Sequence, residues 1–388
     1  MEEKSYLAPP EQAPDLKIPN GSTVVNVRII DSTTRMTIPA AHLLLPEIGQ
    51  HNTMAGAPSF SFLIEHPSGR KLVFDLGLRK DFKNLPPVVQ KFLADFGWEI
   101  TVQKNISEIL EENGVPSSTI EAVIWSHHHF DHVGDMCTFP SSTKIIVGPG
   151  FKSAYLPGWP TNENSSLAEK DWEDRTIQEL SYGSNNEELA IGSFRAVDFF
   201  GDGSYYILDS PGHTVGHIAA LARVTVGGQG TSSDTFVLMG GDTCHFAGQF
   251  RPTQYRPLPV EVILSPLPHI HAGACPGSLF QDLHPHKNAT EPFYEMPQTS
   301  TVDLEAAHES IRKLQLFDAA DNVLVVIAHD ESVVDGIDFF PNAINLWKKK
   351  GYSEKVRWQF LSCFGGHEGH EWVKVRTKDS IGVGFEMK

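Results

Sequence analysis

The sequence has few cysteines and few positive charges for its length. Its 388 residues contain four cysteines, far apart in the chain, which give neither a disulfide framework nor a zinc ribbon. Lysine and arginine number 31 against 48 aspartates and glutamates, so the formal net charge is −17. This charge argues against a polyanionic substrate, because a nuclease has to attract phosphate groups.

Long apolar stretches are also missing. No run reaches the ~18 residues of a membrane span. The N-terminus, which reads MEEKSY, has no apolar stretch of the kind that a secretory signal needs. We therefore expect a cytoplasmic protein without a membrane span. The Gly-x-Ser-x-Gly elbow of serine hydrolases is absent as well, so no side-chain nucleophile is indicated.

Histidine, by contrast, is plentiful, and one histidine cluster stands out. The segment Ser126-His127-His128-His129-Phe130-Asp131-His132 follows residues 122–125, an apolar run typical of a buried strand. In extended backbone, side chains alternate between two faces, so positions 127, 129 and 131 point to the same side. Imidazole and carboxylate together suit Zn, Fe or Mn better than Ca or Mg.

Three further apolar runs end on residue types that bind metals. Residues 205–208 lead to a segment that ends at His213, residues 236–239 lead to Asp242, and residues 323–328 lead to His329. Short loops at the ends of rigid strands hold ligands in a site that is both precise and accessible. The chain thus supplies enough ligands for two metals that share a carboxylate, at the separation of about 3.5–4 Å usual in hydrolytic sites.

The order of these motifs resembles that of the metallo-β-lactamase superfamily of binuclear hydrolases. HxHxDH is followed by PGHTxGH, by GGD and by a strand-ending HD, so the resemblance spans about residues 22–335. Residues 71–77 resemble the early DxG element of the superfamily. The His329-Asp330 ending is most similar to the N-acyl-homoserine-lactone lactonase branch.

The resemblance implies a fold and a ligand set. The fold is α/β, a four-layer αβ/βα sandwich with a binuclear metal site at one edge of its two sheets. The implied cofactors are two divalent ions, with Zn²⁺ favoured and Fe or Mn as alternatives, bridged by Asp242. The remaining ligands are His127, His129 and His213 for the first ion, and Asp131, His132 and His329 for the second.

The resemblance also implies how water would be activated. Two divalent ions lower the pKa of a bridging water toward about 7, so that hydroxide is available at neutral pH. Asp131 would orient this hydroxide and carry its proton to the leaving group. The lactonase branch has a tyrosine three residues after the bridging aspartate, where this chain has His245. That histidine either acts on the substrate, by donating a hydrogen bond or a proton, or supports a ligand from behind.

We predict a hydrolase that opens a lactone or a related cyclic ester or amide. The alternative is a thioesterase, similar to glyoxalase II or to the polyketide-releasing enzymes of the superfamily. Glyoxalase II has a helical C-terminal domain for which the tail after residue 335 is too short. A flavodiiron redox enzyme would need a flavodoxin domain, and a binding protein would not need a complete ligand set. The expected partner is a small molecule with an ester, lactone, lactam or thioester carbonyl, and no nucleic acid.

Other polar residues near these motifs are assigned supporting roles. Asp75 is expected to organise loops by hydrogen bonding rather than to bind metal. His217 is expected to begin a helix or to support a ligand, and His128 to be packed or solvated. Residues 367–370 lack the histidine spacing of a helical zinc protease and are typical of a surface tail.

Residues 1–21 are polar and rich in proline and predict an extended arm, followed by a single catalytic domain over residues 22–388. Hydrophobic patterns predict several internal elements and three terminal ones. The internal strands are expected near 121–126, 144–148, 205–209, 218–226 and 235–239, with a helix at about 302–317. The terminal elements are a helix near 341–350 and strands near 356–361 and 371–376.

A proline- and histidine-rich insertion at about 246–300 follows the bridging-ligand motif. Long irregular segments in compact domains are usually lids or binding loops. We expect the insertion to form a wall of the substrate pocket, and a homodimer contact is the alternative. Its histidines are not expected to bind a third metal. The expected apolar lining is Phe246, Phe250, Tyr255 and Leu258.

Overall fold

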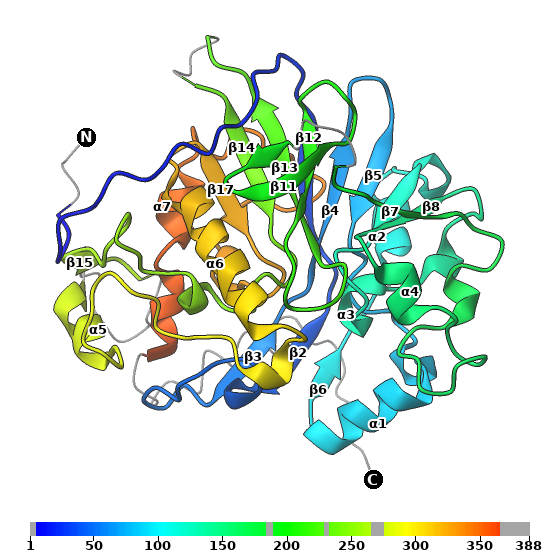
Figure 1. Cartoon of the computed structure of the whole chain (residues 1–388), viewed down its shortest axis with the longest axis horizontal. Coiled ribbons are helices and arrows are strands. Elements are labelled where there is room, and N and C mark those ends of the chain that lie inside the picture. The colour runs from blue at the N-terminus through cyan, green and yellow to red at the C-terminus, as the bar shows by residue number, and fades with distance from the viewer. Residues whose placement is uncertain (1–4, 184–188, 229–232, 265–274, 365–388) are drawn as a thin grey trace.

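The computed structural model describes residues 5–183, 189–228, 233–264 and 275–364. Two six-stranded sheets pack face to face at the centre of the molecule (Figure 1). The strands of the first sheet, in spatial order, are β1 (Asn26–Asp31), β4 (Phe60–Glu65), β5 (Lys71–Phe74), β7 (Ala122–Ile124), β8 (Lys144–Val147) and β9 (Ile177–Glu179). Those of the second are β10 (Ala190–Ile191), β11 (Phe194–Asp198), β12 (Tyr205–Asp209), β13 (Ile218–Thr225), β14 (Thr235–Met239) and β17 (Val323–Val326).

Side-chain alternation along the strands builds both the inner and the outer core. In β12, Tyr205 and Ile207 pack between the sheets, whereas Tyr206 and Leu208 belong to the outer core. Helix α6 (Leu304–Ala319), gold in Figure 1, covers that outer face of the second sheet. Its first turn is capped by the Asp303 carboxylate, which accepts a hydrogen bond from the Ala306 N–H at 3.0 Å.

The outer face of the first sheet is covered by short helices. The hydrophobic core there joins strand residues to α2 (Ile106–Glu112), to α3 (Phe130–Val133) and to α4 (Phe151–Tyr155). The order helix, sheet, sheet, helix confirms the predicted four-layer αβ/βα sandwich. Near α1 (Pro87–Phe96) lies a small sheet of β3 (Thr53–Ala57), β2 (Arg35–Pro39) and β6 (Glu99–Thr101).

Residues 5–21 are extended and lie against the rest of the chain (Figure 1). The Leu7 N–H donates to the Leu258 carbonyl at 2.9 Å, and the Gly192 N–H donates to the Leu16 carbonyl at 2.8 Å. Leu16 is buried in the core beneath α6. Within the ranges that the structure describes, no helix is long and apolar enough to cross a bilayer.

The predicted helix near 341–350 is wrong. The segment forms turns along the free edge of β1, where the N–H groups of Phe340 and Ile344 donate to the carbonyls of Ile29 and Val27 at 2.7 and 2.9 Å. Backbone donors that are used by a sheet edge are not available to a helix. The periodic apolar residues are buried against the sheets instead, as Ile344 shows.

The predicted strand near 356–361 is also wrong. Helix α7 (Tyr352–Val356) and a 3₁₀ turn (Gln359–Phe364) occupy this region. Residues 356–361 largely alternate between apolar and polar types, as in a strand with one side facing solvent. Arg357 is instead buried in an ion pair with Asp318. The predicted strand at 371–376 and the tail at 367–370 lie outside the described residues.

The proline-rich insertion contains a two-stranded hairpin of β15 (Glu261–Val262) and β16 (Cys275–Pro276), followed by α5 (Gly277–Leu283). Phe246, Phe250 and Leu258 all belong to the large outer core, and the last two are 0% exposed. These two side chains therefore stabilise the core instead of lining an open pocket, which corrects that part of the expectation. Tyr255 is half-buried.

Candidate metal centre

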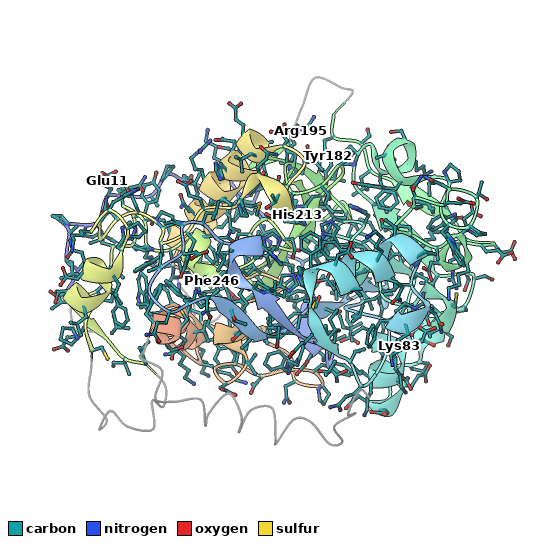
Figure 2. The ribbon with its side chains drawn as sticks, turned by 90° about the horizontal axis from the view of Figure 1, so that it is seen from below. Glu11, Lys83, Tyr182, Arg195, His213 and Phe246 are labelled. Atoms are coloured by element: carbon teal, nitrogen blue, oxygen red, sulfur yellow. The ribbon has the colours of Figure 1, made fainter. Side chains whose placement is uncertain are left out.

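The metal-binding residue types that follow four strands meet at one edge of the sandwich. His127 follows β7, His213 follows β12, Asp242 follows β14 and His329 follows β17. In Figure 2, His213 and Phe246 lie toward the middle of the view, whereas Glu11 and Lys83 lie toward its sides. The strand ends therefore carry these side chains to a common interior position.

The first group consists of three histidines and one aspartate. The ligand atoms of His127, His129, His213 and Asp242 all lie within 4.8 Å of one another. His213 Nε2 is 3.3 Å from His127 Nε2 and 3.1 Å from His129 Nδ1. Burial and the neighbouring histidines lower the pKa of all three imidazoles well below the usual value. Three neutral imidazoles whose lone pairs converge are suited to a divalent cation.

The second group consists of Asp131, His132 and His329, whose ligand atoms also lie within 4.8 Å of one another. Asp131 Oδ2 is 3.5 Å from the Nε2 atoms of both histidines. Burial opposes protonation of His132, but Asp242, Asp131 and Asp75 outweigh burial and hold its pKa well above the usual value. A positive charge is therefore favoured at this position, and a bound cation would supply it.

Asp242 lies between the two groups. Its Oδ2 is 3.6 Å from Nε2 of both His127 and His213 and 3.3 Å from His132 Nε2, and its Oδ1 is 3.2 Å from His329 Nε2. Although burial favours the neutral acid, His132 and His329 hold the pKa of Asp242 well below the usual range. The carboxylate that was predicted to bridge two ions is thus the one that faces both groups.

Unpaired polar atoms test whether these residues fit metal ions. Asp242 Oδ1 and His132 Nε2 are buried, and although they lie 3.2 and 3.3 Å from ion-pair partners, neither makes a hydrogen bond within the described part of the chain. An unsatisfied buried carboxylate oxygen is costly, whereas coordination to a cation compensates its lost hydration. The donor set of imidazoles and carboxylates therefore fits divalent cations.

Asp75 orients His132, which is the organising role predicted for it. Its Oδ1 accepts from the Ser126 N–H at 2.7 Å, and its Oδ2 accepts from the Ser126 hydroxyl at 2.7 Å and from His132 Nδ1 at 2.9 Å. Because the Nδ1 proton of His132 is used in this way, Nε2 presents its lone pair to the centre. Asp75 itself belongs to neither ligand group.

His217 orients the backbone that carries Asp242. Its Nδ1 lies 2.9 Å from the Ser210 carbonyl and donates to it, so Nε2 can accept from the Asp242 N–H at 3.0 Å. Burial is the main cause that lowers the pKa of His217 to about 4, and the ring is therefore neutral. This contact confirms the supporting role predicted for His217.

His245 faces the centre from the side of Asp242. Its Nε2 is 3.5 Å from Asp242 Oδ2, and its ring is parallel to that of His329 at a centroid distance of 6.0 Å. The backbone N–H of His245 donates to Gln249 Oε1 at 2.7 Å, and Gln249 Nε2 donates to the Leu43 carbonyl at 2.9 Å. His245 belongs to neither ligand group.

His128 points away from the ligand groups. Its ring stacks on Tyr155 with a centroid distance of 3.9 Å and an interplanar angle of 16°. Burial is the main cause that lowers its pKa to about 3. The packed alternative predicted for this histidine is therefore the one that the structure shows.

The sequence interpretation missed several residues that support the ligands. Ser126 donates to Asp75, 51 residues earlier in the chain, and Gln249 accepts from the N–H of His245, four residues before it. The Pro58 carbonyl accepts from His329 Nδ1 at 2.6 Å. Isolated serine, glutamine and proline residues produce no recognisable pattern, so only the folded chain reveals them.

A third cluster lies behind the metal loop, where the ligand-type atoms of Asp135, Cys137 and Asp171 are within 4.8 Å of one another. The Arg79 guanidinium already supplies a positive charge there, because its Nη1 is 3.5 Å from Asp171 and its Nη2 is 3.3 Å from Asp135. We therefore assign no metal to this cluster. Burial, the largest cause, together with Asp135 and against Arg79, raises the pKa of Asp171 to about 7.

The Asp171 pKa predicts a pH-dependent stability. Because the folded pKa of about 7 exceeds the usual aspartate pKa of 3.8, the folded state binds more protons between these values. The contribution of Asp171 to the free energy of unfolding therefore falls as the pH rises from ~4 through ~7. Urea unfolding should show that the free energy of unfolding of Asp171→Asn, relative to that of wild type, rises by about 2–4 kcal/mol between pH 5 and pH 8. A difference that does not change with pH would contradict this assignment.

Sequence comparison identifies the family. The model of the metallo-beta-lactamase superfamily matches residues 55–222. The chain is 43% identical over 359 residues to gamma-lactamase FDB1 of Fusarium pseudograminearum (strain CS3096), covering 90% of this chain and 85% of that protein. The chain belongs to the metallo-beta-lactamase superfamily.

This superfamily member is also similar to a second relative in sequence and to a solved structure in fold. Metallo-hydrolase mfmC of Annulohypoxylon moriforme is 41% identical over 385 residues, covering 98% of both chains. A solved N-acyl homoserine lactone hydrolase, which holds the product N-hexanoyl-L-homoserine at its catalytic metal centre, matches with a TM-score of 0.54 and 17% identity. That match covers 83% of this chain and 100% of the other, and it shows a shared fold.

Proposed function

We propose that the chain is a binuclear metal-dependent hydrolase that opens a small lactone or a related cyclic ester or amide. The position of Asp242 carries this proposal, because its carboxylate lies 3.2–3.6 Å from four imidazole nitrogens that belong to both ligand groups. The relative named gamma-lactamase supports a cyclic amide as a substrate class. The lactonase with the same fold supports the fold assignment alone.

The proposed ligands divide between two ions, for which Zn²⁺ is the favoured metal. One ion would be held by the first group, the other by the second, and Asp242 would contact both. When bound, such ions polarise a carbonyl oxygen and lower the pKa of a water molecule. The ligand residues are His127, His129 and His213 for the first ion, and Asp131, His132 and His329 for the second.

The chain itself would contribute two groups to the reaction. Asp131 is positioned by the second ligand group, and we assign its carboxylate to accept a proton from the attacking water and return it to the leaving group. His245 is assigned to donate a hydrogen bond to the oxygen on which charge develops. Its backbone is fixed by Gln249, so the ring does not need to reorganise during the reaction.

Burial and charge favour a small, uncharged substrate. All seven proposed ligands are buried except His129, which is half-buried. His129 is thus the proposed ligand that is most open to a molecule arriving from solvent. Since the chain carries a net charge of −17, an anionic substrate would be repelled at long range.

A substrate screen tests the proposed reaction. We expect the zinc-loaded protein to hydrolyse a subset of γ- and δ-lactones or γ-lactams, and to lose this activity on chelation. Acyl thioesters should be included, because turnover confined to thioesters would replace the proposal by the thioesterase alternative. No hydrolysis of any of these classes by protein shown to contain metal would contradict the proposed function.

His245→Phe is expected to lower kcat on the best substrate by about 10²-fold, the usual effect of removing a donor to a developing oxyanion. Phenylalanine keeps a ring of similar shape in the 2% exposed position but cannot donate a hydrogen bond. Steady-state kinetics should be combined with metal analysis, which should show unchanged metal content. His245→Gln, which retains a donor, should lose less activity. Unchanged turnover in His245→Phe would refute the assigned role.

A further inference from the structure

Residues 58–60, at the start of β4, join the two halves of the metal centre. The Pro58 carbonyl accepts from His329 Nδ1 at 2.6 Å, and the Phe60 N–H donates to the Ala328 carbonyl at 3.0 Å. Between these contacts, the Ser59 hydroxyl donates to the main-chain carbonyl of Asp131 at 2.5 Å. Pro58 and Ser59, which lead into β4, therefore contact two ligands that follow strands of different sheets, His329 after β17 and Asp131 after β7.

The contact made by Ser59 is specific to its position. Asp131 lies in α3, a helix of four residues, and a helix this short leaves its carbonyls without helical donors. Ser59 supplies one such donor from outside. The serine is 0% exposed, so no water competes for the carbonyl, and the Ser32 hydroxyl in turn donates to the Ser59 carbonyl at 2.6 Å.

The two ligand groups differ in their dependence on this contact. The first group is held by other partners, since His127 Nδ1 lies 3.0 Å from the Ser126 hydroxyl and the Asp242 N–H donates to His217. In the second group, His132 is held by Asp75, whereas Asp131 and His329 are held by the segment that contains Ser59. Loss of the Ser59 hydroxyl would thus release the Asp131 backbone while leaving the first group in place.

We infer that Ser59 is a positioning residue for the second metal, because it fixes Asp131 relative to His329. This inference rests on the proposed function, since it assumes that two ions bind. Removal of a hydrogen bond that orients a metal ligand typically lowers the metal affinity by about 10–100-fold. Ser59 therefore sets the affinity of the second site without touching either the ion or the substrate.

Ser59→Ala and Ser61→Ala form a matched pair for the test. Ser61 lies two residues further along, in β4, and is also 0% exposed, but its hydroxyl has no hydrogen-bond partner within the described residues. Metal-free protein is titrated with Zn²⁺ in competition with a chromophoric chelator, and the Co²⁺ absorption spectrum follows the same sites. In Ser59→Ala, one of the two binding steps should weaken about 10–100-fold while the other changes less than about threefold. Both steps should stay at wild-type values in Ser61→Ala.

Several outcomes would overturn the inference. Wild-type affinity for both ions in Ser59→Ala would do so, as would equal weakening of both steps, which would indicate a general structural role. Should Ser59→Ala not fold, Ser59→Cys keeps a weak donor of similar size and should show a partial loss at one step. Wild-type binding by Ser59→Cys in that case would overturn it as well. A wild-type protein that binds fewer than two ions would instead refute the proposed function.

Discussion

Asp242→Ala is expected to abolish hydrolysis, with a loss in kcat/KM of at least about 10³-fold, and to lower the number of bound metal ions. The carboxylate faces imidazoles of both ligand groups at 3.2–3.6 Å, so its removal affects both metal positions together. The imidazoles of both groups would then face their cations without the shared negative charge that stabilises them. Steady-state kinetics and metal analysis of the same preparation would measure both effects.

The control for Asp242→Ala is a carboxylate far from the centre. Asp95→Ala removes one negative charge from the exposed surface of α1, where Asp95 pairs with Lys91. Its activity and metal content should stay at wild-type values. Retention of more than about a tenth of the activity by Asp242→Ala would contradict the bridging role, because loss of a group that stabilises transition-state charge normally costs at least about 10²-fold.

Asp318→Ala is expected to lower the free energy of unfolding by about 3–5 kcal/mol. Asp318 lies on α6 and is 3% exposed in its side chain, where it accepts from Arg251 at 2.7 Å and also pairs with Arg357. Arg251 and Arg357 lower the pKa of Asp318 against the effect of burial, so the carboxylate is ionised. Its removal would leave two buried guanidinium groups without their shared counterion. Urea unfolding monitored by far-UV circular dichroism would measure the change.

A nearby surface pair provides the comparison. Asp321 contacts Arg256, but its side chain is 81% exposed. Ion pairs that are open to solvent usually contribute less than about 1 kcal/mol, so Asp321→Ala should be nearly neutral. Similar losses of unfolding free energy in the two variants would show that burial does not determine how much the ion pairs of Asp318 with Arg251 and Arg357 stabilise the fold.

The candidate ligands were predictable because their chemistry restricts the residue types and because each one follows an apolar strand. The motif around His127 and the separate His213, Asp242 and His329 all lie in the two groups that the structure brings together. Helix α6 was predictable for a similar reason, since its apolar residues recur at helical spacing and pack on the second sheet.

Other features depend on long-range hydrogen bonds that no local pattern reveals. Phe340 and Ile344 donate to the edge of β1, more than 300 residues earlier in the chain, which prevents the predicted helix. From the sequence alone, Arg357 is expected to face solvent, and only the fold shows that it is buried beside Asp318. Likewise, nothing near Ser59 in the sequence indicates that it contacts Asp131. In each case the partner is supplied by the fold.

The most direct test of the proposed binuclear centre is anomalous diffraction from crystals of the zinc-loaded protein, recorded at the zinc absorption edge. The ligand geometry predicts two anomalous peaks about 3.5–4 Å apart, one beside His127 and His213 and the other beside His132 and His329, with Asp242 between them. A single peak, or peaks away from these residues, would contradict the account.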